Sequence, residues 1–217
     1  MKIIFEDNHL LVVEKPINMP VCQDSSKDLD LLTALKDYLK EKYDKPKNVY
    51  LGLVHRLDRP VGGVMVFAKT SKAASRLSDS LRRDLFKKTY LAIVCGQAKN
   101  KDHLQDYLIK DFKTNMVKVT SKENGKLAIL DYTLIKTKDD LSLVEIDLQT
   151  GRSHQIRVQM SNANLPLWGD QRYNPNSKKG QQIALYAKKL SFPHPISKET
   201  VSFTCYPTSA KIWSYFD

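Results

Sequence analysis

A short cluster of charged residues, HRLD at 55–58, lies between two apolar runs of the chain. The run that follows, Val64–Ala68, is typical of a strand, so the cluster should lie on a loop supported by a sheet, where catalytic groups often occur. Asp58 is flanked by Arg56 and Arg59, and nearby positive charge favours the ionised form of a carboxylate. Asp58 is therefore a candidate nucleophile or base for an anionic substrate such as a nucleic acid.

A second group of polar residues, GRSHQIR at 151–157, contains two more arginines. If this segment is helical from about Ser153, His154 and Arg157 are three residues apart and share one face. An arginine that projects from one element toward a carboxylate on another would orient that acid and keep it charged. Only eight of the 35 basic residues are arginines, and four of them lie in 55–59 and 151–157. The two segments could therefore meet at one site.

The charge balance favours a polyanionic partner, most commonly a nucleic acid, because 35 Lys and Arg against 24 Asp and Glu give a net charge of +11. No apolar run approaches the roughly 20 residues that span a membrane. The early acids Glu6 and Asp7 are unlike a signal peptide. Cys22, Cys95 and Cys205 are widely spaced and odd in number, so neither a disulfide framework nor a zinc site is implied, and a cytoplasmic location is expected.

The elements that must position these residues follow from the hydrophobic period. Strands are expected over 2–6, 9–14, 64–68, 87–95, 129–135, 141–148, 182–192 and 200–204. Helices are expected over 29–43, over 71–85 with Ser71 as the cap and Leu85 facing the core, from about Ser153, and over 209–216. Turns are expected at Arg59-Pro60 with Gly62-Gly63, and at 136–140. Many strands and few helices predict an α+β fold with a mixed, largely antiparallel sheet and flanking helices.

Five sequence blocks, in order, resemble the RluA branch of the pseudouridine synthases. They are DNHLLVVEKP (7–16), HRLD (55–58), KKTYLAIV (87–94), GRSHQIRV (151–158) and IALYAKKLSFPHP (183–195). The resemblance implies the pseudouridine synthase fold, with one catalytic domain over 1–217 and a central active-site cleft. It also implies an RNA enzyme without cofactor or metal. Such an enzyme detaches uracil from its ribose, rotates the base and rejoins it through C5.

The resemblance gives three residues a catalytic role. Asp58 matches the catalytic aspartate of the family. Tyr90, on the strand of the third block, matches the tyrosine that stacks on the uracil and is a candidate base for the C5 proton. Arg157 matches the arginine that pairs with the aspartate and would hold Asp58 ionised in a partly desolvated pocket.

Five further residues are expected to bind the substrate. Arg56 matches the arginine that enters the RNA stack when the target base flips out, and flipping costs on the order of a few kcal/mol. Leu185 matches an apolar contact to the base. His55, Arg152 and His154 belong to the two motifs. The two histidines are expected to be hydrogen-bonding residues near the site rather than an acid and a base.

Two departures from the family pattern are visible. The loop reads HRLDRPVGG where the family usually has HRLDxxTSG, so Val61 and Gly63 replace a threonine and a serine. Many relatives carry an S4 RNA-binding module in front, whereas here the first block begins at residue 7. The basic surface of the catalytic domain is therefore expected to supply the affinity for an rRNA or tRNA stem-loop, and a monomer is expected.

Two alternatives from other classes stay open. The chain could be a non-catalytic RNA-binding protein on the same scaffold. It could also be a metal-dependent hydrolase in which His55, Asp58 and His154 ligate the metal. No further carboxylate cluster accompanies these three residues, so the expected site holds no metal.

Overall fold

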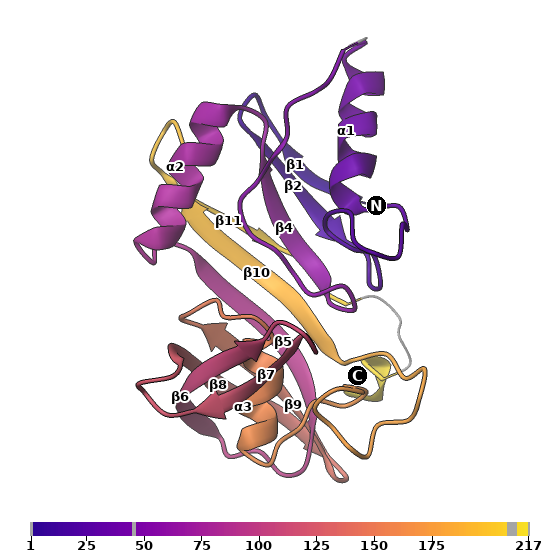
Figure 1. Ribbon diagram of the computed structural model, residues 1–217, viewed down its shortest axis with the longest axis vertical. Coiled ribbons are helices and arrows are strands. Elements are labelled where there is room, and N and C mark those ends of the chain that lie inside the picture. Colours follow the sequence, from indigo (N-terminus) through magenta and orange to yellow (C-terminus); the bar gives the residue numbers. More distant parts are fainter. Residues whose placement is uncertain (1, 45–46, 208–211, 217) are drawn as a thin grey trace. The chain divides into compact units, whose positions relative to one another are not determined.

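The computed structural model describes residues 2–44, 47–207 and 212–216, and the chain divides into two compact units (Figure 1). Unit 1 comprises Met1–Phe86 and Lys189–Tyr206, and unit 2 comprises Lys87–Lys188 and Pro207–Asp217. The chain thus passes between the units three times, once within a strand. The single catalytic domain over 1–217 stays a prediction.

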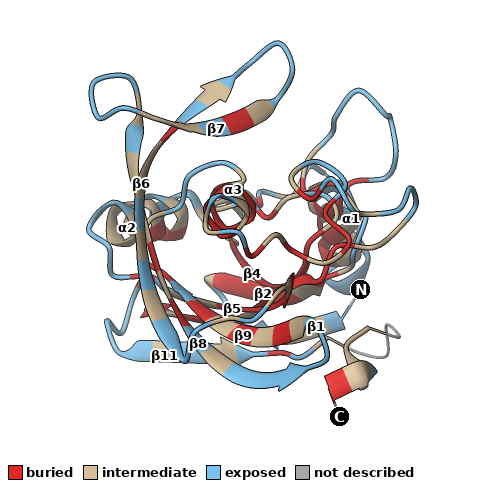
Figure 2. Cartoon of the chain, turned by 90° about the horizontal axis from the view of Figure 1, so that it is seen from below, coloured by how far each residue is buried: buried red, intermediate tan, exposed pale blue. Residues whose placement is uncertain are grey.

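Unit 1 is built on antiparallel strands. They are β1 (Lys2–Glu6), β2 (Leu10–Lys15), β3 (Gly52–Leu53), β4 (Gly62–Ala68), the end of β10 (Leu185–Pro193) and β11 (Thr200–Thr204). β2 pairs with both β1 and β4, and all seven residues of β4 are buried (Figure 2). The strands predicted over 2–6 and 9–14 are confirmed and pair as a hairpin, whose second strand forms part of the core.

Two capped helices belong to unit 1. In α1 (Leu31–Lys42) the side chain of Asp30 accepts the N–H of Thr33 at 3.0 Å. In α2 (Ser71–Arg82) the cap is Thr70, whose hydroxyl accepts the N–H of Ala73 at 3.1 Å. The prediction of Ser71 as the cap was one residue too late. A cap residue is extended and accepts an N–H of the first turn through a side-chain oxygen, and Thr70 meets both conditions.

Helix α2 also ends earlier than predicted. Asp84 has a left-handed φ of 54°, its N–H bonds the Leu81 carbonyl, and the N–H of Leu85 bonds the Ser80 carbonyl. This is a Schellman motif, which closes a helix and turns the chain away. Leu85 is consequently 41% exposed, and the prediction that it faces the core was wrong.

Unit 2 contains a run of antiparallel strands in the order β5, β9, β8, β6, β7. Their bounds are β5 (Lys87–Cys95), β6 (Lys101–Asp111), β7 (Met116–Thr120), β8 (Lys126–Lys138) and β9 (Leu141–Leu148). β8 is longer than predicted, so the turn to β9 is only Asp139-Asp140 rather than 136–140. The left-handed φ of 49° at Asp139 allows this short turn.

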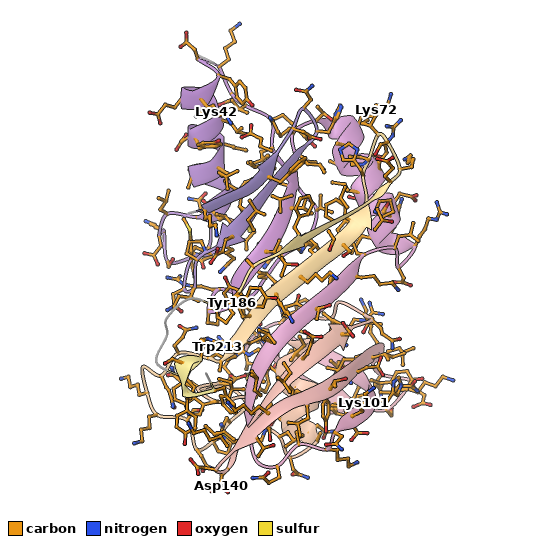
Figure 3. All side chains as sticks on the ribbon, turned by 180° about the vertical axis from the view of Figure 1, so that it is seen from behind. Lys42, Lys72, Lys101, Asp140, Tyr186 and Trp213 are labelled. Carbon is orange, nitrogen blue, oxygen red and sulfur yellow. The ribbon has the colours of Figure 1, made fainter. Side chains whose placement is uncertain are left out.

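The two remaining elements of unit 2 are short. Helix α3 (Gln155–Asn162) begins two residues later than predicted. Of the predicted helix 209–216, residues 209–211 lie outside the described residues, and Ser214–Phe216 forms a single 3₁₀ turn, η1. Beside that turn, the rings of Trp213 and Tyr186 meet edge to face, with centroids 6.5 Å apart (Figure 3).

The predicted fold class is confirmed, because in the part of the chain that the structure describes three α-helices accompany mostly antiparallel strands. Over the described residues, none of the helices has both the length and the apolar surface that crossing a membrane requires.

Candidate active site

In unit 1, Asp58 begins a tight turn that leads directly into the buried strand β4. The N–H of Val61 bonds the carbonyl oxygen of Asp58 at 3.0 Å, and Val61 is buried. The predicted turn at Arg59-Pro60 is confirmed, but Gly62-Gly63 are the first two residues of β4 rather than part of a turn. The turn that carries Asp58 is therefore anchored at once to the most buried strand of the unit.

Lys15, the last residue of β2, holds the backbone of this turn. It is 1% exposed, and its Nζ donates to the carbonyl oxygens of Pro16 at 2.9 Å, Arg59 at 2.9 Å and Val61 at 2.8 Å. An ammonium group has three N–H donors, and here three acceptors receive them. Burial lowers the pKa of Lys15 to about 7, while the charge of Asp58 acts to raise it and that of Arg59 to lower it.

The two arginines beside Asp58 point to different surroundings. Arg56 is exposed. Arg59 pairs with Asp28, and its Nη1 lies 2.9 Å from Ser26 Oγ and 3.4 Å from Asp24 Oδ2. The guanidinium of Arg59 is thus directed to loop 24–28. Lys15 is a cation of unit 1 whose pKa burial lowers and the charge of Asp58 acts to raise.

His55 is fixed as a hydrogen-bond acceptor. Its Nε2 accepts the backbone N–H of Val66 on β4 at 3.2 Å, so that nitrogen carries no proton. Its ring meets Phe86 edge to face, with centroids 6.3 Å apart. This contact pattern agrees with the expectation of a hydrogen-bonding residue rather than an acid or a base.

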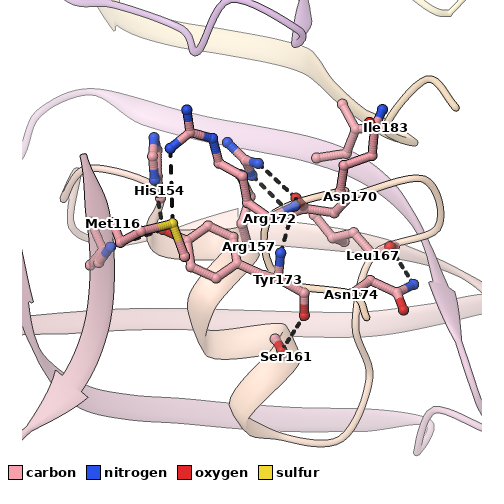
Figure 4. A network of polar contacts seen from close by, with 12 residues as sticks. Met116, His154, Arg157, Ser161, Leu167, Asp170, Arg172, Tyr173, Asn174 and Ile183 are labelled. Carbon is pink, nitrogen blue, oxygen red and sulfur yellow. Dashed lines mark hydrogen bonds and ion pairs between the residues drawn. The ribbon is translucent and has the colours of Figure 1, made fainter. Parts of the chain in front are cut away.

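In unit 2, Arg157 lies on α3 and forms a bidentate ion pair with Asp170 (Figure 4). Its Nε donates to Asp170 Oδ2 at 2.8 Å, and its Nη2 donates to Oδ1 at 2.6 Å. The two side chains are 6% and 0% exposed. The ring of Tyr173 lies against the guanidinium, with its centroid 5.2 Å from Cζ. Asp170 thus contacts one edge of the Arg157 guanidinium, and Tyr173 contacts one of its faces.

Tyr173 joins His154 to Arg157. His154 has a left-handed φ of 51° at the cap position of α3, so it lies outside the helix, and the prediction that the two residues share a helix face was wrong. Its Nδ1 lies 2.7 Å from the Tyr173 hydroxyl, which also accepts the N–H of Val117 on β7 at 2.9 Å. The loop that carries Tyr173 is therefore joined to both α3 and β7.

Gln155 of the GRSHQIRV motif and Gln159, the residue after the motif, anchor α3 to the strands of unit 2. Gln155 and Gln159 are 3% and 0% exposed, and Gln155 Nε2 donates to Gln159 Oε1 at 3.0 Å. Gln155 Oε1 accepts from the Thr150 hydroxyl at 2.8 Å. Gln159 Nε2 donates to Asp106 Oδ2 on β6 at 2.8 Å and to the Ala128 carbonyl on β8 at 3.2 Å. This chain of buried amides fixes the helix on which Arg157 lies.

The other predicted residues of unit 2 occupy strands or the surface. Tyr90 on β5 and Leu185 on β10 are 9% and 5% exposed. Arg152 is exposed, and its Nε donates to the carbonyl oxygen of Leu127 at 2.8 Å. His55, Arg56 and Asp58 belong to unit 1, so the structure describes the two groups of site residues separately. The pairing of Asp58 with Arg157 stays a prediction.

Sequence reasoning missed three residues of these two groups, namely Lys15, Asp170 and Tyr173. Lys15 lies in the first block of the family resemblance, but a lysine at the end of an apolar strand is usually solvated, so its residue type gave no signal. The pair Gly169-Asp170 does offer one. Gly169 has a left-handed φ of 75°, and a Cβ there would clash with the carbonyl oxygen of Gln182. Only glycine fits, and it aims the next residue into the unit.

The described residues contain no group of three or more His, Cys, Asp or Glu side chains placed to hold a metal ion. The trio suggested from the sequence, His55, Asp58 and His154, is accordingly not among such groups. In His55 the Nε2 is already the acceptor of a backbone N–H.

Comparison with known protein families gives a match over most of the chain. The family described as RNA pseudouridylate synthase matches residues 9–162. An uncharacterized RNA pseudouridine synthase of Bacillus subtilis, YhcT, is 32% identical over 203 residues, which cover 93% of this chain and 67% of that protein.

Two relatives carry a more specific name. Ribosomal large subunit pseudouridine synthase D of Zymomonas mobilis is 34% identical over 215 residues, covering 94% of this chain and 68% of that protein. The protein of the same name from Neisseria meningitidis serogroup A is 34% identical over 216 residues, covering 94% and 57%. This chain thus spans between 57% and 68% of the length of these two relatives.

Among solved structures, human RNA pseudouridylate synthase domain containing 4 superposes with a TM-score of 0.80 at 22% sequence identity. The superposition covers 95% of this chain and 89% of the human chain. At this level of identity the likeness concerns the fold.

Proposed function

The chain belongs to the RNA pseudouridylate synthase family and is an isomerase of uridine in RNA, and on this premise we propose that Asp58 starts the reaction on a uridine of a ribosomal RNA stem-loop. The names of the relatives in Zymomonas and Neisseria support ribosomal RNA, and a tRNA stem-loop is the second substrate to test. We further propose a cytoplasmic monomer. Neither a non-catalytic RNA-binding protein nor a metal-dependent hydrolase is favoured by this family membership.

In the proposed reaction, a carbon–carbon bond replaces the carbon–nitrogen bond between ribose and uracil. The C1′–N1 bond breaks, the base rotates, a C1′–C5 bond forms, and a proton leaves C5 while N1 gains one. Asp58 acts as an ionised carboxylate, either by attacking C1′ or by taking a proton from C2′ to give a glycal. Tyr90 stacks on the uracil and removes the C5 proton. Arg157 pairs with Asp58 and keeps it negative.

We propose that the loop between β6 and β7 contacts the RNA. The loop is exposed (Figure 2). Phe112 in this loop is 86% exposed, and Lys110 Nζ lies 5.6 Å from the centre of its ring. Lys113 and Lys118 are exposed beside it. An exposed aromatic ring among lysines suits a base that stacks while its phosphates are neutralised.

The observation that carries the proposal is the presence of HRLD and GRSHQIRV in a chain whose residues 9–162 match the family. The test is Asp58→Asn, with tritium release from 5-³H-uridine RNA as the measurement. The rate should fall by at least roughly a hundredfold, while the Kd for RNA stays near the wild-type value. Asp79→Asn, on the exposed side of α2, is the matched control and should keep the rate. An active Asp58→Asn variant would end the assignment of Asp58.

A chelator separates the proposal from the hydrolase alternative. Pseudouridine formation should continue in excess EDTA, because no step of the proposed reaction uses a metal. Loss of product with EDTA, restored by a divalent cation, would favour the hydrolase. An RNA-bound protein that forms no pseudouridine in ribosomal RNA or tRNA would favour the non-catalytic alternative.

A further inference from the structure

We propose that Asp170 and Tyr173 are positioning residues that fix the orientation of the Arg157 guanidinium, an inference that rests on the proposed role of Arg157. The three residues lie in unit 2, and the contacts between them are drawn in Figure 4. Neither Asp170 nor Tyr173 belongs to the motifs that identify the family resemblance. Their role follows from how they enclose the arginine.

Asp170 fixes the direction in which the guanidinium points. Two parallel hydrogen bonds, from Nε and Nη2 to the two carboxylate oxygens, define the plane of the group as well as its position. These two hydrogen bonds use one edge of the guanidinium, which has five N–H donors. The Nη1 side of the same group therefore points away from Asp170, which is the arrangement that an arginine needs to serve a second anion.

Tyr173 restricts motion out of that plane. Its ring lies 5.2 Å from Arg157 Cζ, and burial raises the pKa of Tyr173, so a neutral phenol faces the cation. The hydroxyl accepts the N–H of Val117, and its own hydrogen can go to Nδ1 of His154. His154 of the motif therefore has a role, because its contact with the Tyr173 hydroxyl orients the ring that covers Arg157.

Asp170 is itself held by the backbone around it. Its Oδ1 accepts the N–H of Arg172 at 3.0 Å, and its carbonyl accepts the N–H of Asn174 at 2.9 Å. Asn174 Nδ2 in turn donates to the Leu167 carbonyl at 3.0 Å. A buried ion pair is seldom needed for stability, because apolar residues of similar size often serve as well. The directional geometry of this pair is therefore better explained by orientation of Arg157.

The first test compares kinetics of single variants. Asp170→Asn should lower kcat by roughly a hundredfold, since a displacement of about 1 Å can cost that much, with KM for RNA changed by less than about threefold. Tyr173→Phe, which keeps the ring, should lose much less than Tyr173→Leu, which removes it. Asp102→Asn, which weakens a surface pair with Lys99 far from the motifs in sequence, is the matched control. Wild-type kcat in a folded Asp170→Asn variant, together with equal rates for both Tyr173 variants, would overturn the proposal.

A double variant separates positioning from general stability. In an Arg157→Lys background, adding Asp170→Asn should lower kcat by less than about twofold further, because the group it orients is gone. A full hundredfold further loss would show that Asp170 acts elsewhere. If Asp170→Asn does not fold, adding Tyr173→Leu to the Arg157→Lys background gives the same comparison.

A spectroscopic measurement needs no activity and so distinguishes failure of this inference from failure of the proposed function. The Nε–H signal of Arg157, assigned by its loss in Arg157→Lys, should exchange slowly with water in the wild type. In Asp170→Asn it should exchange at least tenfold faster, with backbone amide signals far from Asp170 unchanged. Equal exchange in both proteins would overturn the inference, even if the wild type makes pseudouridine.

Discussion

In each unit, one buried ionisable side chain fixes the backbone or another side chain of the candidate site. Lys15 does so for the turn of Asp58, where one ammonium group joins three carbonyl oxygens from two segments of the chain. Asp170 does so for Arg157. In each case a residue of the motifs depends on a partner that lies outside the motif itself.

Replacing Lys15 with methionine should destabilise the protein. The carbonyl oxygens of Arg59 and Val61 would lose a buried donor, at a cost of about 1–3 kcal/mol of unfolding free energy. Because the turn carries Asp58, kcat should fall as well. Urea unfolding and the tritium-release rate measure the two effects, and Lys72→Met on the exposed side of α2 is the control. Unchanged stability and rate in Lys15→Met would contradict the role given to this residue.

The comparison of the wild type with Lys15→Met should also depend on pH. Burial lowers the pKa of Lys15 to about 7, from an ordinary value of 10.5 in the unfolded chain. Between these values the unfolded chain holds a proton that the folded protein lacks, so the contribution of Lys15 to the unfolding free energy rises with pH. The difference between wild type and Lys15→Met should therefore grow by roughly 2–3 kcal/mol from pH 7 to pH 9. A difference that stays constant across this range would contradict the lowered pKa.

The sequence could predict roles for residues of HRLD and GRSHQIRV but not for these supporting residues. Asp58 and Arg157 are recognisable because HRLD and GRSHQIRV are local patterns. Lys15 acts on residues 44 and 46 positions away, and Tyr173 acts on Val117 from 56 positions away. No local period records such pairings, and a lysine after an apolar strand is read equally well as a solvated end.

At the scale of elements, helix α1 is joined to strand β1 through one carboxylate. Burial by itself raises the pKa of Glu6, but hydrogen bonds from Lys42, Lys69, Tyr43 and Tyr38 outweigh that effect and lower it to about 2. Glu6 is only 8% exposed, whereas Lys42 is 43% exposed. The carboxylate therefore connects β1, α1 and the residue after β4 from a nearly buried position.

Acid should remove this connection. Because the folded pKa of Glu6 lies below the unfolded value of 4.5, its contribution is fully present above pH 4.5 and is lost as the pH falls toward 2. The stability difference between wild type and Glu6→Gln should shrink over this range by up to about 3 kcal/mol, less where solvent screens Lys42. Thermal unfolding at pH 6, 4 and 3 measures it, with Glu41→Gln as the control. A difference that does not shrink would contradict the prediction.

The loop between β6 and β7 gives a prediction for RNA binding. Phe112→Leu keeps an apolar side chain but removes the ring, so the affinity for RNA should fall by about 1–3 kcal/mol, the usual worth of one stacked base. Phe112→Tyr keeps the ring and should bind like the wild type. Fluorescence anisotropy with a labelled ribosomal RNA stem-loop measures the Kd values. Equal affinities for Phe112→Leu and Phe112→Tyr would show that the ring does not stack.

The sequence predicted the existence of the elements better than their ends. The predictions of strands over 87–95 and 141–148 match the observed bounds of β5 and β9, the second because alternation continues to the last paired residue. The end of α2 depends on the left-handed Asp84, and the start of α3 on the left-handed His154. Both positions are more often glycine or asparagine, so their residue types gave no warning of where the helices stop or start.

At the scale of the whole molecule, the net charge of +11 should make RNA binding depend strongly on salt. Each phosphate that a lysine or arginine neutralises releases condensed counterions, so log Kd should rise linearly with log salt concentration. With several such phosphates neutralised, the affinity for a ribosomal RNA stem-loop should fall by at least roughly a hundredfold between 50 and 300 mM KCl. A nearly flat dependence would mean that apolar interactions dominate.

The same titration shows which lysines contribute to that slope. Changing Lys110 and Lys113 together to glutamine should reduce the slope by about 1 for each phosphate that is no longer neutralised, and should weaken binding to unrelated RNA by the same factor. Lys36→Gln with Lys40→Gln, on α1, removes the same charge from another surface and serves as the matched control. An equal change of slope in both double variants would assign the affinity to net charge alone, because a diffuse field depends on the total charge whereas direct pairing with phosphates depends on where the charge lies.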